Sequence, residues 1–347
     1  MLAKKQIPFF NYQALFAAQE KELTQIVVDV MRRGAYILQK DLVDFEAALR
    51  SYLGVKYAWG VADGTNALEI ALIAAGIRPG DEIIVPSHTY IASAAAIHFV
   101  GATPVLVECG RDHLIDPESA RSAVTGRTRA IMPVQLNGRT CDMDAIGALA
   151  REHQLSIIED AAQALGSRFK GRFAGTFGAA GTFSFYPAKV LGCFGDGGGV
   201  VTNDDAIGRR LMLLRDHGRD EEGLVVTWGK NSRLDNLQAA ILLHKLRSFD
   251  DVLERRRAIA RQYQAGLQDV GELLLPPGPD ADPDHHDVYQ NYEIEADRRD
   301  ALKVALEADG IRTIIQFGGR AVHQFNGLDV EHFRLPYTER VYQRTLL

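Results

Sequence analysis

From residue 60 to residue 204, short apolar runs alternate with segments of helical periodicity. Four apolar runs without regular alternation are predicted strands, at residues 81–87, 103–109, 129–136 and 155–161. Between them lie a small-residue helical segment at 91–101 and an amphipathic segment at 143–154. Continuous apolar strands separated by helices predict an α/β fold with a mostly parallel central sheet that is covered on both faces. In such a sheet the functional loops lie at the carboxyl ends of the strands.

The pattern changes after residue 231. Residues 235–267 have apolar positions at a helical period and contain no Pro or Gly until Gly266, which predicts one or two long helices. A Pro- and Asp-rich connector at 273–290 follows, and residues 291–317 then predict a strand, a helix and a second strand. We expect a large domain over residues 1–235, with a helical N-terminal segment. A smaller C-terminal α+β domain should cover residues 236–347 and be incomplete at its C-terminal end.

Composition and charge exclude several classes of partner. The formal net charge of −6 and the mixed charge pattern argue against a nucleic-acid partner or a polybasic membrane surface. The three widely spaced cysteines form no Cys-x-x-Cys pair, so we expect free thiols in a reducing, cytoplasmic compartment. No apolar run is long enough to cross a bilayer, and no histidine pair has metal-ligand spacing beside carboxylates, so neither a membrane span nor a metal site is expected.

Two loops that follow predicted strands carry groups able to bind a ligand. Asp160 ends the strand at 155–160, where a carboxylate either faces a ligand or caps a following helix. Residues 63–65, Asp-Gly-Thr, form a tight turn before an apolar helix. The free backbone amides of a helix N-terminus bind phosphate well, although simple capping by Asp63 or Thr65 explains the same residues.

Lys189 lies between an apolar run and a run of glycines. Neighbours such as Phe183, Phe185 and Tyr186 shelter it, and burial of a lysine favours the neutral amine that forms Schiff bases. A phosphate-binding turn, a strand-end Asp and a sheltered Lys match the three fixed points of pyridoxal phosphate (PLP). The glycines at 195–199 do not fit G-x-G-x-x-G and do not open a helix, which argues against a dinucleotide-binding loop.

Five motifs then resemble, in order and spacing, those of the DegT/StrS-type sugar-nucleotide aminotransferases. They are DGTNAL at 63–68, VPSHTYIASAAA at 85–96, IIEDAAQALGS at 157–167, FSFYPAKVLGCFGDGG at 183–198 and GKNSRLDNLQAAIL at 229–242. The resemblance implies a fold-type I PLP-dependent transferase. It further implies a homodimer with two shared active sites.

The resemblance also implies roles for individual residues. Lys189 forms the Schiff base with PLP and moves the proton between the donor Cα and the cofactor, and Asp160 pairs with the pyridine nitrogen. The remaining implied cofactor contacts are Gln163 near the 3-oxygen, Tyr90 and Ala162 on the two ring faces, Gly64, Thr65 and Ser184 at the phosphate, and Asn231 at the phosphate of the neighbouring subunit.

Two loops depart from the family pattern, at PVQLNG (133–138) and at IIQFGGRAVHQF (314–325). Gln135 and Asn137 stand where many relatives have His and Tyr, and Gln316, Gly318 and Gly319 replace a Tyr and Pro pattern. We expect these loops to face the substrate, with substrate contacts from His88, Gln135, Lys230 and His323.

The activity that the resemblance implies is transfer of an amino group from an amino acid, L-glutamate, to a nucleotide-linked keto sugar. The product would be an amino sugar for a glycan, an O-antigen or an antibiotic. The NSRLD stretch at 231–235 is typical of enzymes that aminate C3, so a 3-keto sugar is predicted, with a 4-keto sugar as the alternative. A PLP-dependent sugar dehydratase is disfavoured because Lys189 stands where those relatives have His. A PLP-binding regulator without turnover is the remaining alternative.

Overall fold

A seven-stranded sheet forms the centre of the computed structural model, which describes residues 6–347. Its strands are, in spatial order, β1 (Tyr57–Val61), β9 (Gly198–Thr202), β8 (Ala180–Ser184), β5 (Ser156–Asp160), β4 (Thr128–Ile131), β2 (Glu82–Pro86) and β3 (Thr103–Val107). Neighbours from β8 to β3 are parallel, whereas β9 is antiparallel to both β8 and β1. The strand β1 therefore runs in the same direction as β8, and the predicted mostly parallel sheet is confirmed.

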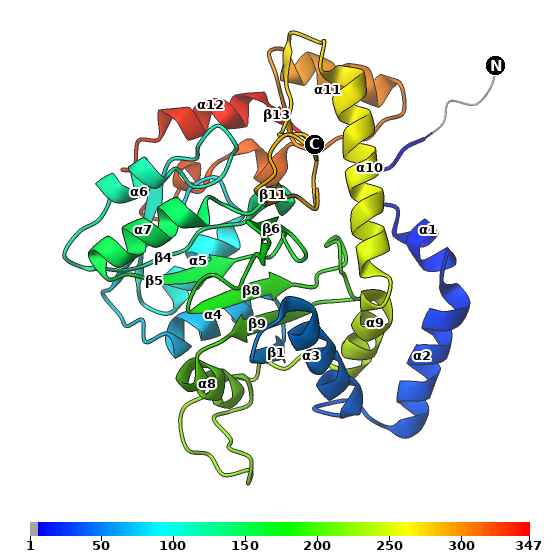
Figure 1. The fold of residues 1–347 in the computed structure, drawn as a ribbon, viewed down its shortest axis with the longest axis vertical. Helices are drawn as coiled ribbons and strands as arrows, with labels where there is room; N and C mark the ends of the chain where they lie inside the picture. The colour runs from blue at the N-terminus through cyan, green and yellow to red at the C-terminus, as the bar shows by residue number, and fades with distance from the viewer. Residues whose placement is uncertain (1–5) are drawn as a thin grey trace.

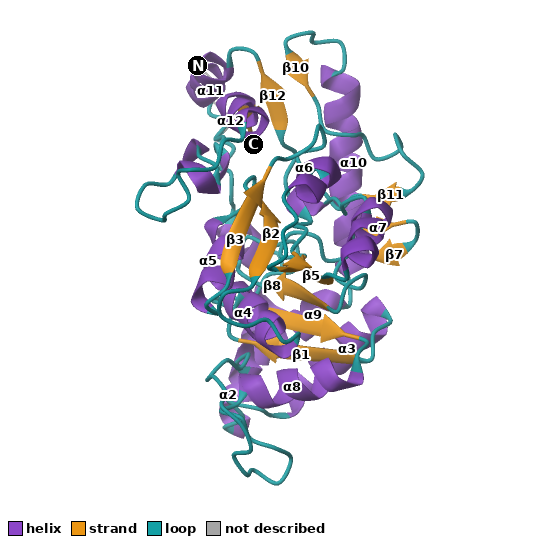
Figure 2. Cartoon of the chain, turned by 90° about the vertical axis from the view of Figure 1, so that its left-hand side faces the viewer, coloured by secondary structure: helices purple, strands orange, loops and turns teal. Residues whose placement is uncertain are grey.

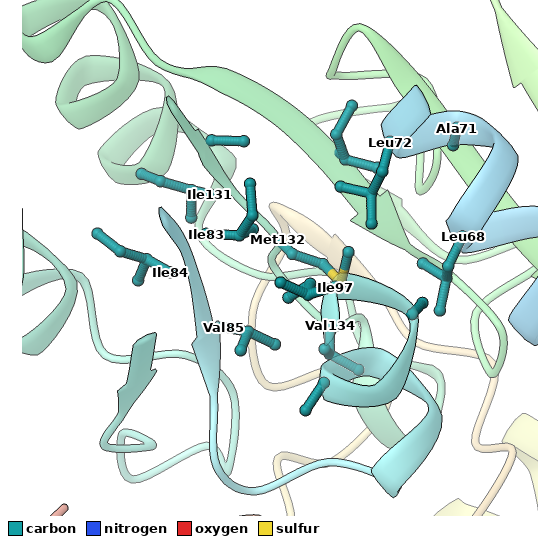
Figure 3. Close-up of a cluster of buried hydrophobic side chains, with 14 of the residues drawn as sticks. Leu68, Ala71, Leu72, Ile83, Ile84, Val85, Ile97, Ile131, Met132 and Val134 are labelled. Atoms are coloured by element: carbon teal, nitrogen blue, oxygen red, sulfur yellow. The ribbon is translucent and has the colours of Figure 1, made fainter. Parts of the chain in front are cut away.

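Helices cover both faces of this sheet (Figure 2). One face carries α4 (Gly64–Ala74), α5 (Ile91–Phe99) and α8 (Asp205–Arg215), and the other carries α3 (Lys40–Leu53), α7 (Met143–His153) and α9 (Asn236–Leu246). Burial on both sides explains why the strands are apolar without alternation. In β2, for example, Ile83, Ile84 and Val85 are all fully buried, and Figure 3 shows them with Leu68 of α4 and Ile97 of α5. Each such side chain stabilises the fold by about 1.5–3 kcal/mol.

The two ends of the chain lie outside this sheet. The N-terminal helices α1 (Tyr12–Ala17) and α2 (Glu20–Arg33) lie at one side of the sheet, where α2 packs against α9. Elsewhere, the short helix α6 (Pro117–Ser122) packs against α7. The long helix α10 (Phe249–Leu267) runs from α9 to the C-terminal part of the chain (Figure 1). The sequence predicted one or two long helices over 235–267, and the structure has two, α9 and α10, with a break at residues 247–248.

The C-terminal part contains an antiparallel sheet of β10 (Leu273–Leu274), β12 (Ile294–Ala296) and β13 (Thr345–Leu346), with α11 (Arg299–Ala308) and α12 (Pro336–Arg344). A second small sheet joins β11 (His285–His286), β6 (Arg168–Phe169) and β7 (Arg172–Phe173). The strand expected at 311–317 is absent from the described residues, and that part of the prediction is wrong. Ile311 forms only an isolated bridge with Ile7, and β13 takes the place beside β12.

Within residues 6–347, no helix combines the length and the apolar composition needed to cross a membrane.

Candidate active site

The carboxyl ends of β1, β5 and β8 bring the three predicted PLP contacts to one edge of the sheet. Gly64 begins α4 directly after β1, and a Cβ atom added to it would lie 2.9 Å from Cβ of Ser184 at the end of β8. Asp160 ends β5 and pairs with Thr182 of β8. The segment with Lys189 begins where β8 ends. The turn, the carboxylate and the lysine, which are far apart in sequence, therefore lie around a common edge.

The first turn of α4 is open to an anion. Asp63 caps the helix, because its Oδ1 accepts a hydrogen bond from the Asn66 N–H at 2.8 Å. The N–H groups of Gly64 and Thr65 have no acceptor among residues 6–347, because the first N–H groups of a helix lack a partner within the helix. The hydroxyl of Ser184 faces the same turn, and Gly64 has no side chain to fill the space between them. Capping by Asp63 is thus confirmed, and the free amides still offer the geometry that phosphate groups use.

The glycine run after Lys189 has a packing role. Gly198 opens β9, and a Cβ atom there would lie 2.3 Å from the carbonyl oxygen of Asp63. Gly197 is similarly close to Cys193, with 2.9 Å to its Sγ atom. The glycines therefore let β9 pass directly beneath the turn between β1 and α4. They open a strand and not a helix, which is further evidence against a dinucleotide-binding loop.

The carboxylate of Asp160 is buried and held by two donors. The Ser93 hydroxyl donates to Oδ2 at 2.7 Å and the Ala162 N–H donates to Oδ1 at 3.2 Å. Burial raises the pKa of Asp160, while these two bonds and the charge of Lys189 oppose the rise. No helix begins after Asp160, since residues 161–167 form turns, so the helix-capping alternative is wrong. Ser93 carries a hydroxyl within the apolar helix α5, and no pattern in the sequence marks it as part of the site.

Lys189 has a sheltered amine with no direct partner. Burial lowers the pKa of Lys189, and only the charge of Asp160 opposes this shift. Among residues 6–347, Nζ makes neither a hydrogen bond nor an ion pair. Gln290 fixes the backbone on both sides of the lysine, since its Nε2 donates to the Ala188 carbonyl and its Oε1 accepts from the Val190 N–H, both at 2.9 Å. The result is an amine on a fixed backbone whose lowered pKa favours the neutral form more than in an exposed lysine, and the neutral form is the one that acts as a nucleophile or proton carrier.

The predicted ring contacts lie on the loops that follow β2 and β5. Tyr90 precedes α5 and is exposed, and its ring centroid lies 5.7 Å from that of Phe317 in the C-terminal part. Ala162 is partly buried next to Asp160. Gln163 accepts a hydrogen bond at Oε1 from the Asn137 N–H at 2.7 Å. Phe317 was not singled out in the sequence, although its neighbours were.

Asn231 and Lys230 follow a loop at 217–229 that protrudes beyond α8 (Figure 1). The side chain of Asn231 is exposed and makes no hydrogen bond within the described part of the chain. Lys230 is half-buried and forms an ion pair with Glu69 of α4. In a single chain, Asn231 is therefore left free for a contact elsewhere.

Three of the predicted substrate contacts, Gln135, His323 and His88, have buried side chains. Gln135 is fully buried, with Nε2 donating to Glu159 at 2.8 Å and Oε1 accepting from the Cys141 N–H at 2.6 Å. His323 is buried with Nδ1 on the Ser87 hydroxyl and Nε2 on Glu339. Their polar atoms are engaged inside the protein and are closed to a substrate.

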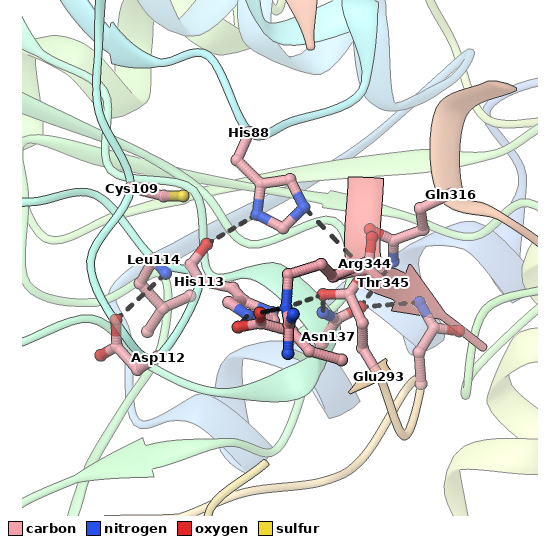
Figure 4. Close-up of polar contacts among 12 residues, drawn as sticks. His88, Cys109, Asp112, His113, Leu114, Asn137, Glu293, Gln316, Arg344 and Thr345 are labelled. Carbon is pink, nitrogen blue, oxygen red and sulfur yellow. Dashed lines mark hydrogen bonds and ion pairs between the residues drawn. The ribbon is translucent and has the colours of Figure 1, made fainter. Parts of the chain in front are cut away.

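His88 is also buried and belongs to a cluster of charged residues (Figure 4). Its Nδ1 donates to the His113 carbonyl oxygen at 3.0 Å, and Nε2 lies 3.9 Å from Glu293. The ring of His113 donates to Glu293 at 2.8 Å and to Glu295 at 3.1 Å. Burial works against a charge on His113, but these two carboxylates raise its pKa to about 10.

The cluster corrects the prediction that no histidines lie beside carboxylates at metal-ligand spacing. Candidate ligand atoms of His88, His113 and Glu293 lie within 4.8 Å of one another. Both nitrogens of His113 are already bonded to carboxylates, however, so a metal ion would have to displace a firmly held proton. The cluster is therefore a buried set of ion pairs that joins the segment at residues 293–295 to the loops that follow β2 and β3.

The residues at the sheet edge fit PLP. Among residues 6–347, Lys189 is the one cation whose charge acts on the buried carboxylate of Asp160, and a protonated pyridine nitrogen would supply a second positive charge. The open amides of Gly64 and Thr65 suit the phosphate, and the unpaired amine of Lys189 suits the aldehyde. Each of the three groups of PLP would thus find a side chain or backbone group of matching chemistry at this sheet edge.

Comparisons with known proteins agree with this geometry. A model of the DegT/DnrJ/EryC1/StrS aminotransferase family matches residues 17–347. Over 313 residues, or 90% of this chain and 82% of the relative, the sequence is 44% identical to the dTDP-3-amino-3,4,6-trideoxy-alpha-D-glucose transaminase of Streptomyces venezuelae. It is 39% identical over 289 residues to the UDP-2-acetamido-2-deoxy-3-oxo-D-glucuronate aminotransferase of Pseudomonas aeruginosa, covering 83% of this chain and 79% of that one.

The fold is equally similar to a solved structure. The crystal structure of S. venezuelae DesV in complex with a ketimine intermediate superposes with a TM-score of 0.93 at 41% identity, over 98% of this chain and 92% of that one. The family is PLP-dependent. The chain belongs to the DegT/DnrJ/EryC1/StrS aminotransferase family and is a PLP-dependent sugar aminotransferase.

Proposed function

We propose that this protein transfers the amino group of L-glutamate to the 3-keto group of a nucleotide-linked sugar in the cytoplasm. The amino sugar would serve glycan, O-antigen or antibiotic synthesis. The observation that carries the chemistry is the unpaired amine of Lys189 beside the buried carboxylate of Asp160. We also propose the division into a large domain at 1–235 and a C-terminal domain at 236–347.

Lys189 and Asp160 would divide the chemical work. PLP, when bound, supplies an aldehyde that condenses with amines and an electron sink for the deprotonated carbon. The neutral amine of Lys189 would take the proton from Cα of the donor and deliver it to the cofactor. In the second half-reaction it would move a proton in the opposite direction. The carboxylate of Asp160, oriented by Ser93 and by the Ala162 N–H, would keep the pyridine nitrogen protonated.

Other residues would bind and orient. The amides of Gly64 and Thr65 and the hydroxyl of Ser184 would hold the phosphate, in the space that a Gly64 side chain would otherwise fill. Tyr90, paired with Phe317, would cover one face of the ring, and Ala162 would cover the other. Among the four predicted substrate contacts, Lys230 alone has a partly exposed side chain, and we propose that it contacts the substrate.

We propose a homodimer in which Asn231 reaches the phosphate of the neighbouring site. The loop before Asn231 exposes a row of apolar side chains, of which Trp228 is 95% and Val225 is 68% exposed. Apolar side chains at such exposure are costly in water and typical of an interface. Within residues 6–347 the side chain of Asn231 is exposed and has no hydrogen-bond partner, as a contact across that interface requires.

The 3-keto assignment rests on relatives and not on Ser232. The two relatives described above are named for a 3-amino and a 3-oxo sugar. Ser232 is fully buried, with its hydroxyl 3.4 Å from the Ala62 N–H, so it lies inside the chain and not against a sugar. Its effect on the orientation of a sugar would therefore be exerted through the turn between β1 and α4.

The two half-reactions can be tested separately. L-Glutamate should convert the PLP form of the protein to the pyridoxamine form, which is followed by loss of visible absorbance. A 3-keto sugar nucleotide should then restore the PLP form, and a matched 4-keto compound should restore it slowly. Restoration by the 4-keto compound alone would overturn the 3-keto assignment. A protein that binds PLP but shows no conversion with any amino acid would be a regulator and not an enzyme.

A further inference from the structure

Asn137 connects the C-terminal part of the chain to Gln163. It lies between β4 and α7 with a left-handed backbone, at φ 56°, and is followed by Gly138 at φ 89°. This conformation turns its N–H toward Gln163, where it donates to Oε1 at 2.7 Å. Gly138 is required here because a Cβ atom would lie 2.7 Å from the backbone nitrogen of Gln290. The turn is therefore pressed against the same segment that flanks Lys189.

The side chain of Asn137 makes three further bonds, all to the C-terminal part. Its Oδ1 accepts from Gln316 Nε2 at 2.6 Å and from Asn291 Nδ2 at 2.9 Å. Its Nδ2 donates to Glu293 Oε2 at 2.8 Å. Figure 4 shows Asn137 between Glu293 and Gln316. Every polar group of this side chain is thus used to hold the turn in place.

Glu293 in turn belongs to the buried ion cluster. Burial opposes its ionisation, but the hydrogen bond and charge of His113 and the bond from Asn137 hold the pKa of Glu293 below its usual value. Glu295, which lies in β12 two residues after Glu293, accepts hydrogen bonds from both Arg344 and His113. The position of Asn137 is therefore fixed by a charged, solvent-excluded anchor, and such anchors move little.

The bond to Gln163 has a consequence for its amide orientation. A backbone N–H can only donate, so the oxygen of the Gln163 amide must face Asn137 and the NH₂ group must face the other way. Among residues 6–347, this NH₂ group has no hydrogen-bond partner. It remains a donor without a partner on a residue of the loop that follows β5, directly after Ala162.

We propose that Asn137 is a positioning residue that forces Gln163 to donate to the 3-oxygen of bound PLP. This inference rests on the proposed role of Gln163 at that oxygen. Under this proposal, the orientation of the Gln163 amide also depends on the packing of residues 288–293 and of Gln316 against the turn at Asn137. A donor at this position would stabilise the anionic 3-oxygen, so this oxygen would hold the proton that it shares with the Lys189 nitrogen less strongly. The pKa of that proton would therefore be lower.

The test is the pH titration of the visible absorption band of the PLP-bound protein. Asn137→Gly keeps the backbone N–H and tolerates φ 56°, but it removes all three side-chain anchors. Its titration midpoint should rise by about 0.5–1 pH unit as Gln163 loses its fixed orientation. Gln316→Met removes one anchor at similar volume and should shift the midpoint less, in the same direction. Gln163→Glu removes the donor itself and should shift it most.

Asn203→Gly is the matched control. Asn203 lies after β9 at the opposite edge of the sheet and accepts one hydrogen bond, from the Lys56 N–H at 3.0 Å. Its titration midpoint should equal that of the unchanged protein. An unshifted midpoint in folded, PLP-loaded Asn137→Gly overturns the proposal. If that variant does not fold, an unshifted Gln316→Met overturns it. An unchanged protein that shows no PLP band at all would instead refute the proposed function.

Discussion

Replacement of Asp160 by Asn tests the electrostatic core of the site with a change of almost no volume. The carboxylate accepts from the Ser93 hydroxyl at 2.7 Å and from the Ala162 N–H at 3.2 Å. An Asn side chain has one acceptor oxygen, so it keeps one of these bonds and turns its NH₂ group toward the other donor. The negative charge that would hold the pyridine nitrogen protonated is lost completely.

The magnitude follows from the burial of this group. Loss of one preorganised electrostatic partner typically costs about 2.7–4 kcal/mol, or roughly 100- to 1,000-fold in rate. Asp160 is only 5% exposed, so water cannot replace the missing charge, and we expect the upper part of this range. The apoprotein should not lose stability, because burial raises the pKa of Asp160 and therefore makes its charge costly in the fold.

The assay is the rate constant for conversion of the PLP form by saturating L-glutamate in a single half-reaction, with urea unfolding of the apoprotein measured in parallel. Asp142→Asn is the matched control, because Asp142 caps α7 through the Asp144 and Ala145 N–H groups and Asn caps equally well. A folded, PLP-loaded Asp160→Asn protein with a rate close to that of the control would refute the role given to Asp160.

Lys189→Ala should abolish turnover while PLP still binds. In the unchanged protein, borohydride reduction followed by peptide mapping should find the reduced cofactor on Lys189. A cofactor attached to another lysine would contradict the assignment. Lys189→Ala and Asn231→Ala subunits should regain activity when mixed, since one site of the mixed dimer carries neither change; no recovery despite proven subunit exchange rules out shared sites. Gly64→Ala should weaken PLP binding by about tenfold or more, because its Cβ would lie 2.9 Å from Ser184 in the phosphate cradle, and unchanged affinity in equilibrium dialysis argues against that cradle. The pKa of His113 is raised from 6.5 to about 10, so its contribution to stability is complete below pH 6.5 and is lost as the pH rises through about 10. Urea unfolding should therefore show a steeper fall over that window for the unchanged protein than for His113→Gln, and parallel profiles would contradict this.

Local pattern was sufficient for the elements whose apolar positions are buried on both sides. β2, β5 and α7 form where the runs at 81–87, 155–161 and 143–154 predict them. The motifs around Asp160 and Lys189 likewise indicate PLP from their residue types and spacing alone. Each motif could be predicted because its residues are neighbours in sequence, and the match of three separate motifs to the groups of PLP then indicated that they share one site.

The remaining features depend on contacts between distant segments. Ser93 and Gln290 act on Asp160 and on the Lys189 backbone from elements far along the chain, and no local pattern marks them. Gln135 lies in a loop that the family pattern places near the substrate, yet folding directs its side chain to Glu159. The strand expected at 311–317 failed because the edge beside β12 is filled by β13, a choice that only tertiary packing makes.

The proposed contacts of PLP with Gly64, Asp160 and Lys189, which converge on one sheet edge, would couple cofactor supply to folding. These groups meet only in the native state, so PLP binds the folded chain and not the unfolded one. Free PLP at 100 times its dissociation constant then stabilises the fold by about 2.7 kcal/mol through mass action. The steady-state abundance of the protein in a cell should accordingly follow the PLP pool, because chains that fold without cofactor open more often to proteases. Starvation for vitamin B6 would deplete the enzyme itself as well as its activity.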